Sequence, residues 1–251
     1  MTVREQFVPR HYSGLEGART ITTQQFLMTE MAVTDCIRRQ AIGLFTGDAG
    51  TGKTFAIESA TSELEQPVVR TLFGSQATKR EAARQILQEI NGFAQKGSYY
   101  ELADEVVAAL AEPHVVVIDE AQHLNQDCTF FIRHLIDRPD TNVAILLIGA
   151  GGLISKIKKD PTLDSRVYRR VEFAEMSEDT LLGALPKYHP IYRDADPALL
   201  AELIDRCEVV KHRTLAVFTL TAADLLEDRK EPVLDAATLE KSLALISGEL
   251  Q

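Results

Sequence analysis

Tryptophan is absent from this sequence of 251 residues, and cysteine occurs only three times. Cys36, Cys128 and Cys207 are odd in number, widely separated, and form no Cys-x-x-Cys pair. The sequence therefore gives no indication of a disulfide framework or a cysteine zinc site. Thiols that stay reduced are typical of the cytoplasm, and we expect the protein to be cytoplasmic.

Long apolar runs are also missing. No stretch approaches the ~20 consecutive apolar residues that a membrane-spanning helix needs. The segment 1–6 has none of the apolar character of a secretory signal. Neither a low-complexity tract nor a repeat at solenoid spacing is present. We therefore expect a globular protein without a membrane partner.

Positive charge is in short supply. Lysine and arginine together number 27 against 37 acidic residues, so the formal net charge is −10. This balance argues against binding of nucleic acid by the whole surface, although it leaves room for a local basic stripe. The 45% hydrophobic share supplies a sizeable core, and the length suits one large or two small domains.

Short apolar runs alternate with helical patterns through the first two thirds of the chain. A helix is expected from Thr22 or Thr23 to Gln40. The expected strands are 41–46, 67–73, 114–118, 142–148 and 170–173, and the helices between them are 54–64, 78–90, 99–111, 126–137 and 153–158. This alternation predicts an α/β fold in which helices cover both faces of a parallel sheet, in three layers.

The pattern changes from Ser177 onward. The remaining segments are helical in periodicity, with no strand between them: 177–185, 197–206, 214–226 and 235–246. The polar beginning of the chain contains Pro9, Gly14 and Gly17 and is expected to be extended. We therefore predict an N-terminal arm at 1–20, a nucleotide-binding α/β subdomain at 21–175 and an all-helical subdomain at 176–251.

A glycine-rich loop follows the first predicted strand and precedes a predicted helix. It consists of Gly47, Asp48, Ala49, Gly50, Thr51, Gly52, Lys53 and Thr54, which is the Gly-x-x-x-x-Gly-Lys-Thr phosphate loop. Glycine is needed because backbone N–H groups must close around phosphate oxygens without interference from a Cβ atom. We expect Lys53 to reach the β- and γ-phosphates of ATP and the Thr54 hydroxyl to ligate Mg²⁺.

Two acids end the most apolar predicted strand. Asp119 and Glu120 follow His114-Val115-Val116-Val117-Ile118, and acids at the end of a buried strand are costly unless they serve a cation or a reaction. Asp119 is placed to hold Mg²⁺. Glu120 is placed to orient or deprotonate the water that attacks the γ-phosphate. Together with the loop, they predict a Mg²⁺-dependent ATPase.

The loop, the acidic strand end and the helical tail together resemble an AAA+ ATPase over roughly residues 20 to 230. Within that superfamily, Asp119 to Leu124 (Asp-Glu-Ala-Gln-His-Leu) resembles the signature of the bacterial branch that holds the transposition ATPases Mu B and TnsC, the IstB-like helpers and the ExeA-type secretion ATPases. The resemblance implies a P-loop AAA+ three-layer parallel sheet with a C-terminal all-helical lid subdomain. Asp-Glu-Ala-Gln also resembles helicase boxes, but two RecA-like domains do not fit in this length.

The resemblance also implies residues outside these two motifs. The segment 163–167 is similar to the one that carries an arginine finger into a neighbouring subunit, which points to Arg166, with Arg169 or Arg170 as substitutes. Arg213 falls just before a predicted lid helix, at the position of the sensor 2 arginine. The sensor 1 residue normally supplies a polar side chain at the end of the fourth strand. Here that strand ends Ile148-Gly149-Ala150-Gly151, so sensor 1 is left unassigned.

Two functions compete for this ATPase. In the first, it assembles on duplex DNA as a homo-oligomeric ring or helical filament, binds without sequence preference when ATP is present, and regulates a transposase or its target selection. The DNA contacts would then come from two basic clusters: Lys79 and Arg80, and Lys156, Lys158 and Lys159. In the second, which the net charge suits, it remodels or positions a protein partner as ExeA-like assembly factors do. A P-loop kinase is disfavoured by the acidic pair and the helical tail.

Overall fold

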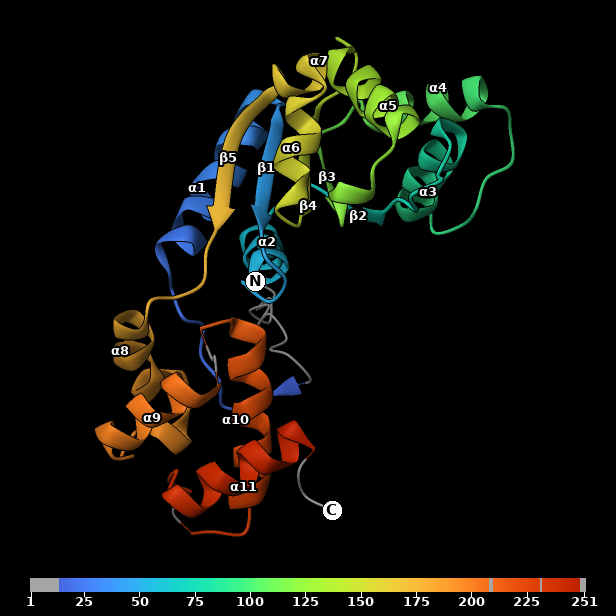
Figure 1. Cartoon of the computed structure of the whole chain (residues 1–251). Helices are drawn as coiled ribbons and strands as arrows, with labels where there is room; N and C mark the ends of the chain where they lie inside the picture. Colours follow the sequence, from blue (N-terminus) through green and yellow to red (C-terminus); the bar gives the residue numbers. More distant parts are fainter. Residues whose placement is uncertain (1–13, 208–209, 231, 249–251) are drawn as a thin grey trace, which may run out of the picture. The chain divides into compact units, whose positions relative to one another are not determined.

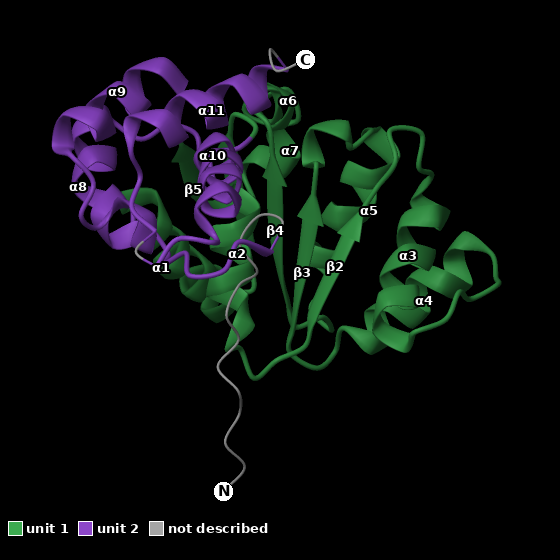
Figure 2. Ribbon diagram, turned by 90° about the horizontal axis from the view of Figure 1, so that it is seen from below, with its two compact units in different colours: residues 1–7, 24–49, 53–173 green, residues 8–23, 50–52, 174–251 purple. Residues whose placement is uncertain are grey.

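A computed structural model describes residues 14–207, 210–230 and 232–248. They form two compact units, which are described separately here. The described part of the first unit comprises residues 24–49 and 53–173. That of the second unit comprises residues 14–23, 50–52, 174–207, 210–230 and 232–248. Figure 2 shows that the strands all belong to the first unit, whereas the second is helical. Residues 1–13, which belong to the predicted N-terminal arm, lie outside the described residues.

The first unit contains a five-stranded sheet in the order β2-β3-β4-β1-β5. All its pairings are parallel. The strands are β1 (Ile42–Gly47), β2 (Val68–Leu72), β3 (His114–Asp119), β4 (Val143–Gly149) and β5 (Val167–Phe173). β1, β3 and β4 lie inside the sheet and are largely buried, whereas the edge strands β2 and β5 contain several exposed residues. The predicted α/β class is confirmed.

Successive residues of the central strands point to opposite faces, which divides the core in two. Val116 and Ile118 of β3 pack in the core beneath one group of helices, and Val115 and Val117 pack in the core beneath another. The first group is α3 (Lys79–Asn91), α4 (Tyr99–Ala109), α5 (Gln126–Asp137), α6 (Gly152–Lys158) and α7 (Pro161–Asp164). The second is α1 (Gln24–Arg39) and α2 (Lys53–Ser62). Figure 1 shows these helices flanking the sheet, which gives the three predicted layers.

Local signals explain where several helices begin and end. Thr78 caps α3 by accepting from the Glu81 N–H, while the Glu81 carboxylate accepts from the Thr78 N–H, a capping box. Ser98 and Glu101 repeat the arrangement at α4. Gly92 ends α3 with φ +78°, a left-handed conformation that glycine adopts without strain. The helix therefore ends at Asn91, one residue beyond the predicted end.

The second unit is built from α8 (Glu178–Tyr188), η3 (Pro190–Tyr192), α9 (Pro197–Cys207), α10 (His212–Leu226) and α11 (Ala236–Ser247). They enclose a separate apolar core in which Tyr192 is fully buried and shares a 2.7 Å hydrogen bond with the Thr219 hydroxyl. Leu15, from the beginning of the chain, is buried in this core. Leu15, within the expected arm, is therefore part of the packing of this unit.

Several boundaries differ from those that the sequence predicts. β5 begins at Val167 rather than residue 170, because its first residues are mostly exposed on an edge strand and carry little apolar signal. α8 continues through Pro186 to Tyr188, and α10 begins at His212. Arg213 therefore lies in the first turn of α10 instead of preceding it. Of the helices that the structure describes, none is both long and apolar enough to cross a membrane.

Candidate functional site

Three strands of the first unit end side by side at one edge of the sheet. β1 ends at Gly47, β3 at Asp119 and β4 at Gly149, and β4 pairs with both of the others. Since all run parallel, their carboxyl ends share one edge, where parallel α/β sheets bind their ligands. The phosphate loop and the acidic pair thus meet at the same place.

Gly47 is confined by the neighbouring strand. Its φ is +152°, and a Cβ atom on it would lie only 2.4 Å from the Phe173 carbonyl oxygen of β5. Gly50 and Gly52 have φ values of +83° and +90°, in the region that side chains disfavour. Glycine is therefore required at all three loop positions by backbone geometry.

Lys53 begins α2, and its ammonium group turns back onto the loop. The Nζ atom donates to the Gly47 carbonyl at 2.8 Å and to the Asp48 carbonyl at 2.7 Å. The charge is thereby held over the strand end rather than out in solvent. A phosphate at the amino end of α2 would meet both this ammonium and the N–H groups of the first helical turn.

Thr54 and Asp119 come together from positions far apart in the sequence. The Thr54 hydroxyl donates to Asp119 Oδ2 at 3.2 Å, and Asp119 Oδ1 accepts from the Glu120 N–H at 2.7 Å. A hydroxyl and a carboxylate are the hard oxygen ligands that Mg²⁺ uses, with phosphates and water completing the set. The residues present therefore fit a Mg²⁺-nucleotide. No group of three or more His, Cys, Asp or Glu residues in the described chain could hold a metal alone, and such a magnesium site needs none.

Glu120 has an unusual backbone conformation. Its φ and ψ are +49° and +36°, which is the left-handed region, and its side chain is 54% exposed. Non-glycine residues in this region carry a conformational cost and cluster at functional sites. The conformation presents the carboxylate to solvent beyond the strand end, where a water molecule has access to it.

Gln122, in the short helix η2 (Ala121–His123), joins Glu120 to the end of β4. Its Nε2 donates to Glu120 Oε2, and its Oε1 accepts from the Ala150 N–H at 3.0 Å. Lys156 Nζ in turn donates to the Gln122 carbonyl. Sequence reasoning missed this residue; the available signal was the missing polar side chain at the end of β4.

The three candidate finger arginines all form ion pairs within the first unit. Arg166 pairs with Asp137, Arg169 with Asp35, and Arg170 with Asp164. The hydrogen bonds from Arg169 hold the pKa of Asp35 below its ordinary value. A finger role for any of them therefore requires a change of partner.

Arg213 lies in the second unit, in the first turn of α10. Residues 50–52 group with this unit, and the Arg213 N–H donates to the Gly50 carbonyl at 3.3 Å. His212 precedes it, and burial lowers the pKa of the His212 imidazole. The sensor 2 role of the Arg213 side chain stays a prediction.

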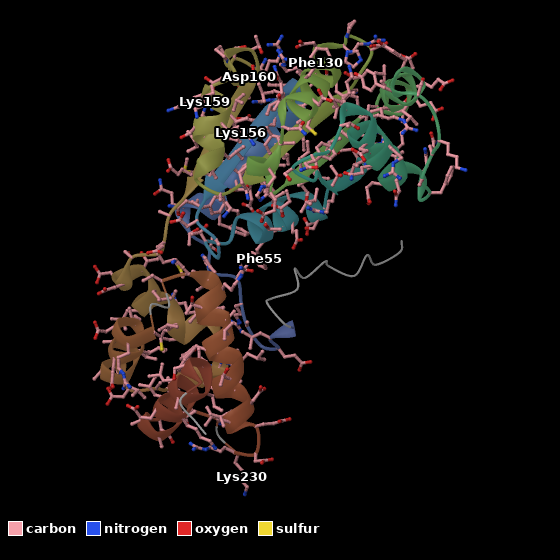
Figure 3. All side chains as sticks on the ribbon, turned by 45° about the vertical axis from the view of Figure 1, so that its right-hand side comes forward. Phe55, Phe130, Lys156, Lys159, Asp160 and Lys230 are labelled. Carbon is pink, nitrogen blue, oxygen red and sulfur yellow. The ribbon has the colours of Figure 1, made fainter. Side chains whose placement is uncertain are left out.

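The five basic candidates for DNA contact differ in their surroundings. Lys79 Nζ lies 4.6 Å from the centre of the Tyr99 ring, and Arg80 donates to the Gly97 carbonyl at 2.8 Å. Lys156 is half-buried and bonded to Gln122, and burial lowers its pKa. Lys158 and Lys159 are exposed. Figure 3 shows Lys156 and Lys159 on the same part of the first unit, close to Asp160.

A hollow of about 690 Å³ lies beside Gln122 on the first unit. Its lining includes Lys156, Lys159, Arg133 and the single acid Asp160. The Arg133 Nε atom is buried and has no hydrogen-bond partner. The hollow thus gathers cations on a protein whose net charge is −10.

Comparison with known proteins agrees with this geometry. Residues 37–157 match a family described as "AAA domain". The matched residues contain the phosphate loop, the acidic pair and β4. No curated protein matches the sequence.

Solved structures of three proteins are similar in fold. The Aeropyrum pernix ORC2 protein, in ADPNP-ADP complexes, is 13% identical with a TM-score of 0.66, over 96% of this chain and 70% of that one. The Aeropyrum pernix ORC1 protein in complex with DNA is 16% identical with a TM-score of 0.62, over 88% of this chain and 64% of that one. The Thermotoga maritima RuvB Holliday junction branch migration motor is 17% identical with a TM-score of 0.61, over 90% of this chain and 70% of that one. At these identities the likeness is one of fold, and the fold is that of a P-loop AAA+ protein.

Proposed function

We propose that this protein binds ATP with Mg²⁺ and hydrolyses it to ADP and phosphate. The observation that carries the proposal is the contact between Thr54 and Asp119, which joins the phosphate loop to the acidic strand end. Lys53 and Glu120 lie at the same edge of the sheet. Neither a phosphate loop without a cation site nor an acidic pair without a phosphate loop would suffice for Mg²⁺-dependent ATP hydrolysis.

Each residue has one task in this proposal. Lys53 binds the β- and γ-phosphate oxygens. Thr54 and Asp119 would hold the metal ion, which would neutralise charge on those oxygens. Glu120 orients a water molecule and accepts its proton as the water oxygen bonds to the γ-phosphorus. The bond from that phosphorus to the bridging oxygen breaks, and ADP leaves with the electron pair.

Two variants test the proposal separately for binding and for turnover. Lys53→Ala should abolish ATP binding in a fluorescent-nucleotide titration, while the exposed Lys96→Ala serves as its charge-matched control. Glu120→Gln should keep ATP bound but cut turnover about 10²–10⁴-fold, the usual effect of removing a general base. Unchanged ATP affinity in Lys53→Ala, or parental turnover in Glu120→Gln, would overturn the assignment.

The cellular task we propose is assembly on duplex DNA, as a ring or filament, to regulate a transposase. Two observations support it: ORC1 is described in complex with DNA and RuvB as a branch migration motor, and Asp119–Leu124 resembles the transposition ATPases. Lys158 and Lys159 are exposed and would supply phosphate contacts in this proposal. We also propose the cytoplasm as the site of action, because the three cysteines show no pattern typical of disulfides.

One observation favours the second candidate, an ATPase that positions a protein partner. The hollow beside Gln122 is lined by Arg133, Lys156 and Lys159, and it suits an acidic side chain better than a continuous duplex. The net charge of −10 points the same way. The two candidates separate in a titration with duplex DNA, which only the first predicts to bind.

A further inference from the structure

The end of β4 has no polar side chain, yet a polar group is present there. The strand ends at Gly149 and Ala150 follows it, and the side chain of Gln122 contacts both residues. A Cβ atom on Gly149 would lie 2.4 Å from Gln122 Oε1, so the glycine makes room for the amide. The space beside β4 is therefore filled by Gln122, which comes from the loop after β3.

Both ends of the Gln122 amide are used. Oε1 accepts from the Ala150 N–H at 3.0 Å, which fixes the orientation of the amide group and turns Nε2 toward Glu120. The backbone carbonyl of Gln122 is itself held by Lys156. The Ala150 N–H holds the side chain of Gln122 and Lys156 holds its backbone, so the hydrogen bond from Nε2 restrains the Glu120 carboxylate.

Glu120 has little else to hold it. Its side chain is 54% exposed, and the His123 Nε2 atom lies 4.0 Å from Glu120 Oε2, beyond hydrogen-bond distance. The left-handed backbone at Glu120 costs free energy that the surrounding contacts must offset. A hydrogen bond to an ionised group is stronger than one between neutral groups, and it fixes direction as well.

From this geometry we propose that Gln122 is a positioning residue for hydrolysis. It ties the Glu120 carboxylate to the end of β4 and supplies from the β3 loop the polar group that β4 lacks. This inference rests on the proposed role of Glu120 as the base. Gln122 touches neither nucleotide nor water in the proposal and acts only through Glu120.

Two substitutions separate positioning from mere packing. Gln122→Glu keeps an acceptor for the Ala150 N–H but cannot donate to Glu120 when ionised, whereas Gln122→Met keeps the volume and loses both bonds. Both should lower kcat about ten- to a hundredfold, the effect of losing one hydrogen bond to a charged group. The Kd for ATP should stay within about twofold, because phosphate binding by Lys53 is untouched. If Gln122→Glu keeps the parental kcat, Gln122 serves only to hold β4 and the proposal fails.

A double-mutant cycle asks whether the effect passes through Glu120. In a Glu120→Gln background, Gln122→Met should change the residual turnover by less than about threefold, because residues that act as a unit are not additive. Full additivity would overturn the proposal. Parental turnover in Glu120→Gln alone would instead overturn the proposed function, so the two failures are distinguishable.

A readout without nucleotide or metal completes the test. In the nucleotide-free protein, the side-chain NH₂ signals of Gln122 in an amide NMR spectrum should shift in Glu120→Ala, since the acceptor is removed. The exposed Glu105→Ala on α4 is the matched control and should leave them in place. Gln122 signals that are the same in the parent and in Glu120→Ala would show that the bond does not exist in solution, and the proposal would fall.

Discussion

Arg166 and Asp137 form a two-point ion pair across the start of β5. Arg166 Nη2 lies 2.7 Å from Asp137 Oδ2, and a second bond joins Nε to the other carboxylate oxygen. The carboxylate raises the pKa of Arg166, so the guanidinium stays charged. Exposed ion pairs contribute little net stability. Arg166 could therefore leave Asp137 for the phosphate of a nucleotide bound to a neighbouring subunit at a small cost in folding free energy.

Arg166→Ala tests the finger role. If Arg166 completes the site of a neighbouring subunit, the variant should lose most turnover; arginine fingers contribute roughly 10³–10⁵ in rate in GTPases. Mixing it with Lys53→Ala should restore part of the activity, since an intact site then faces an intact finger. The measurement is phosphate release against protein concentration.

The control for this experiment is Arg138→Ala, which breaks a comparable surface pair with Asp140. Its turnover should match the parent. Turnover that does not depend on protein concentration, combined with no recovery on mixing, rejects a role between subunits.

Charge reversal tests the DNA surface. Lys158→Glu with Lys159→Glu should remove ATP-dependent duplex binding in an anisotropy titration and leave ATP affinity intact. Lys79→Glu with Arg80→Glu tests the other cluster in the same way. Lys156 is left unchanged because its ammonium holds the Gln122 carbonyl, so its loss would also disturb the catalytic loop.

Salt provides a second measurement of the same surface. Binding should need ATP, rise cooperatively with protein concentration and weaken steeply as salt increases, because phosphate contacts release counterions. If the parent binds no duplex at low salt with ATP, the DNA proposal is wrong and the protein-partner candidate takes its place.

Gly47→Ala tests the close approach of β1 to β5. The added Cβ would lie 2.4 Å from the Phe173 carbonyl oxygen, so the backbone must shift. We expect the free energy of unfolding to fall by about 1–3 kcal/mol, as overpacked sites do, and ATP affinity to fall with it. Gly74→Ala, where nothing lies within 4 Å of the new atom, should change neither. If Gly47→Ala and Gly74→Ala both keep the parental midpoint in urea denaturation, the close approach of Gly47 to Phe173 is contradicted.

His189 predicts a loss of stability in mild acid. Burial lowers the pKa of its imidazole below the ordinary value of 6.5, while Nε2 lies 2.9 Å from the Glu16 carbonyl oxygen. The unfolded chain therefore takes up a proton before the folded one does, and stability is full above pH 6.5 and falls below it. His189→Asn should flatten that dependence in urea melts between pH 5 and 7.5. Since burial also lowers the pKa of His212, part of the slope should remain.

The phosphate loop and the acidic strand end could be predicted because each is a contiguous pattern. Glycine spacing dictates the loop, and an apolar run that stops at Asp119 dictates a strand with an acid at its end. The burial of β1, β3 and β4 agrees with these patterns. Local chemistry was sufficient in these cases because the determining residues are neighbours in sequence.

The contacts that orient the site could not be predicted in this way. Arg166 and Asp137 meet through the packing of α5 and β5, and Gln122 meets Ala150 only because β3 and β4 are adjacent. Nothing local signals that Lys156 turns inward while Lys158 and Lys159 do not. The orientation of these side chains depends on tertiary contacts. A basic cluster on a helix therefore predicts where positive charge lies, but not which ammonium groups are exposed for binding.

The position of β1 in the sheet affects the order in which the protein can be made. β1 carries the phosphate loop, but it pairs only with β4 and β5: Ile42 lies beside Ile145, and Gly47 beside Phe173. Neither neighbour exists while the ribosome has completed only the first half of the chain. Chains fold as their partners emerge, and distant pairings form slowly. A nascent chain therefore carries the complete loop sequence well before β1 is paired on both sides, and we expect a chain that terminates before β5 to leave β1 as an edge strand.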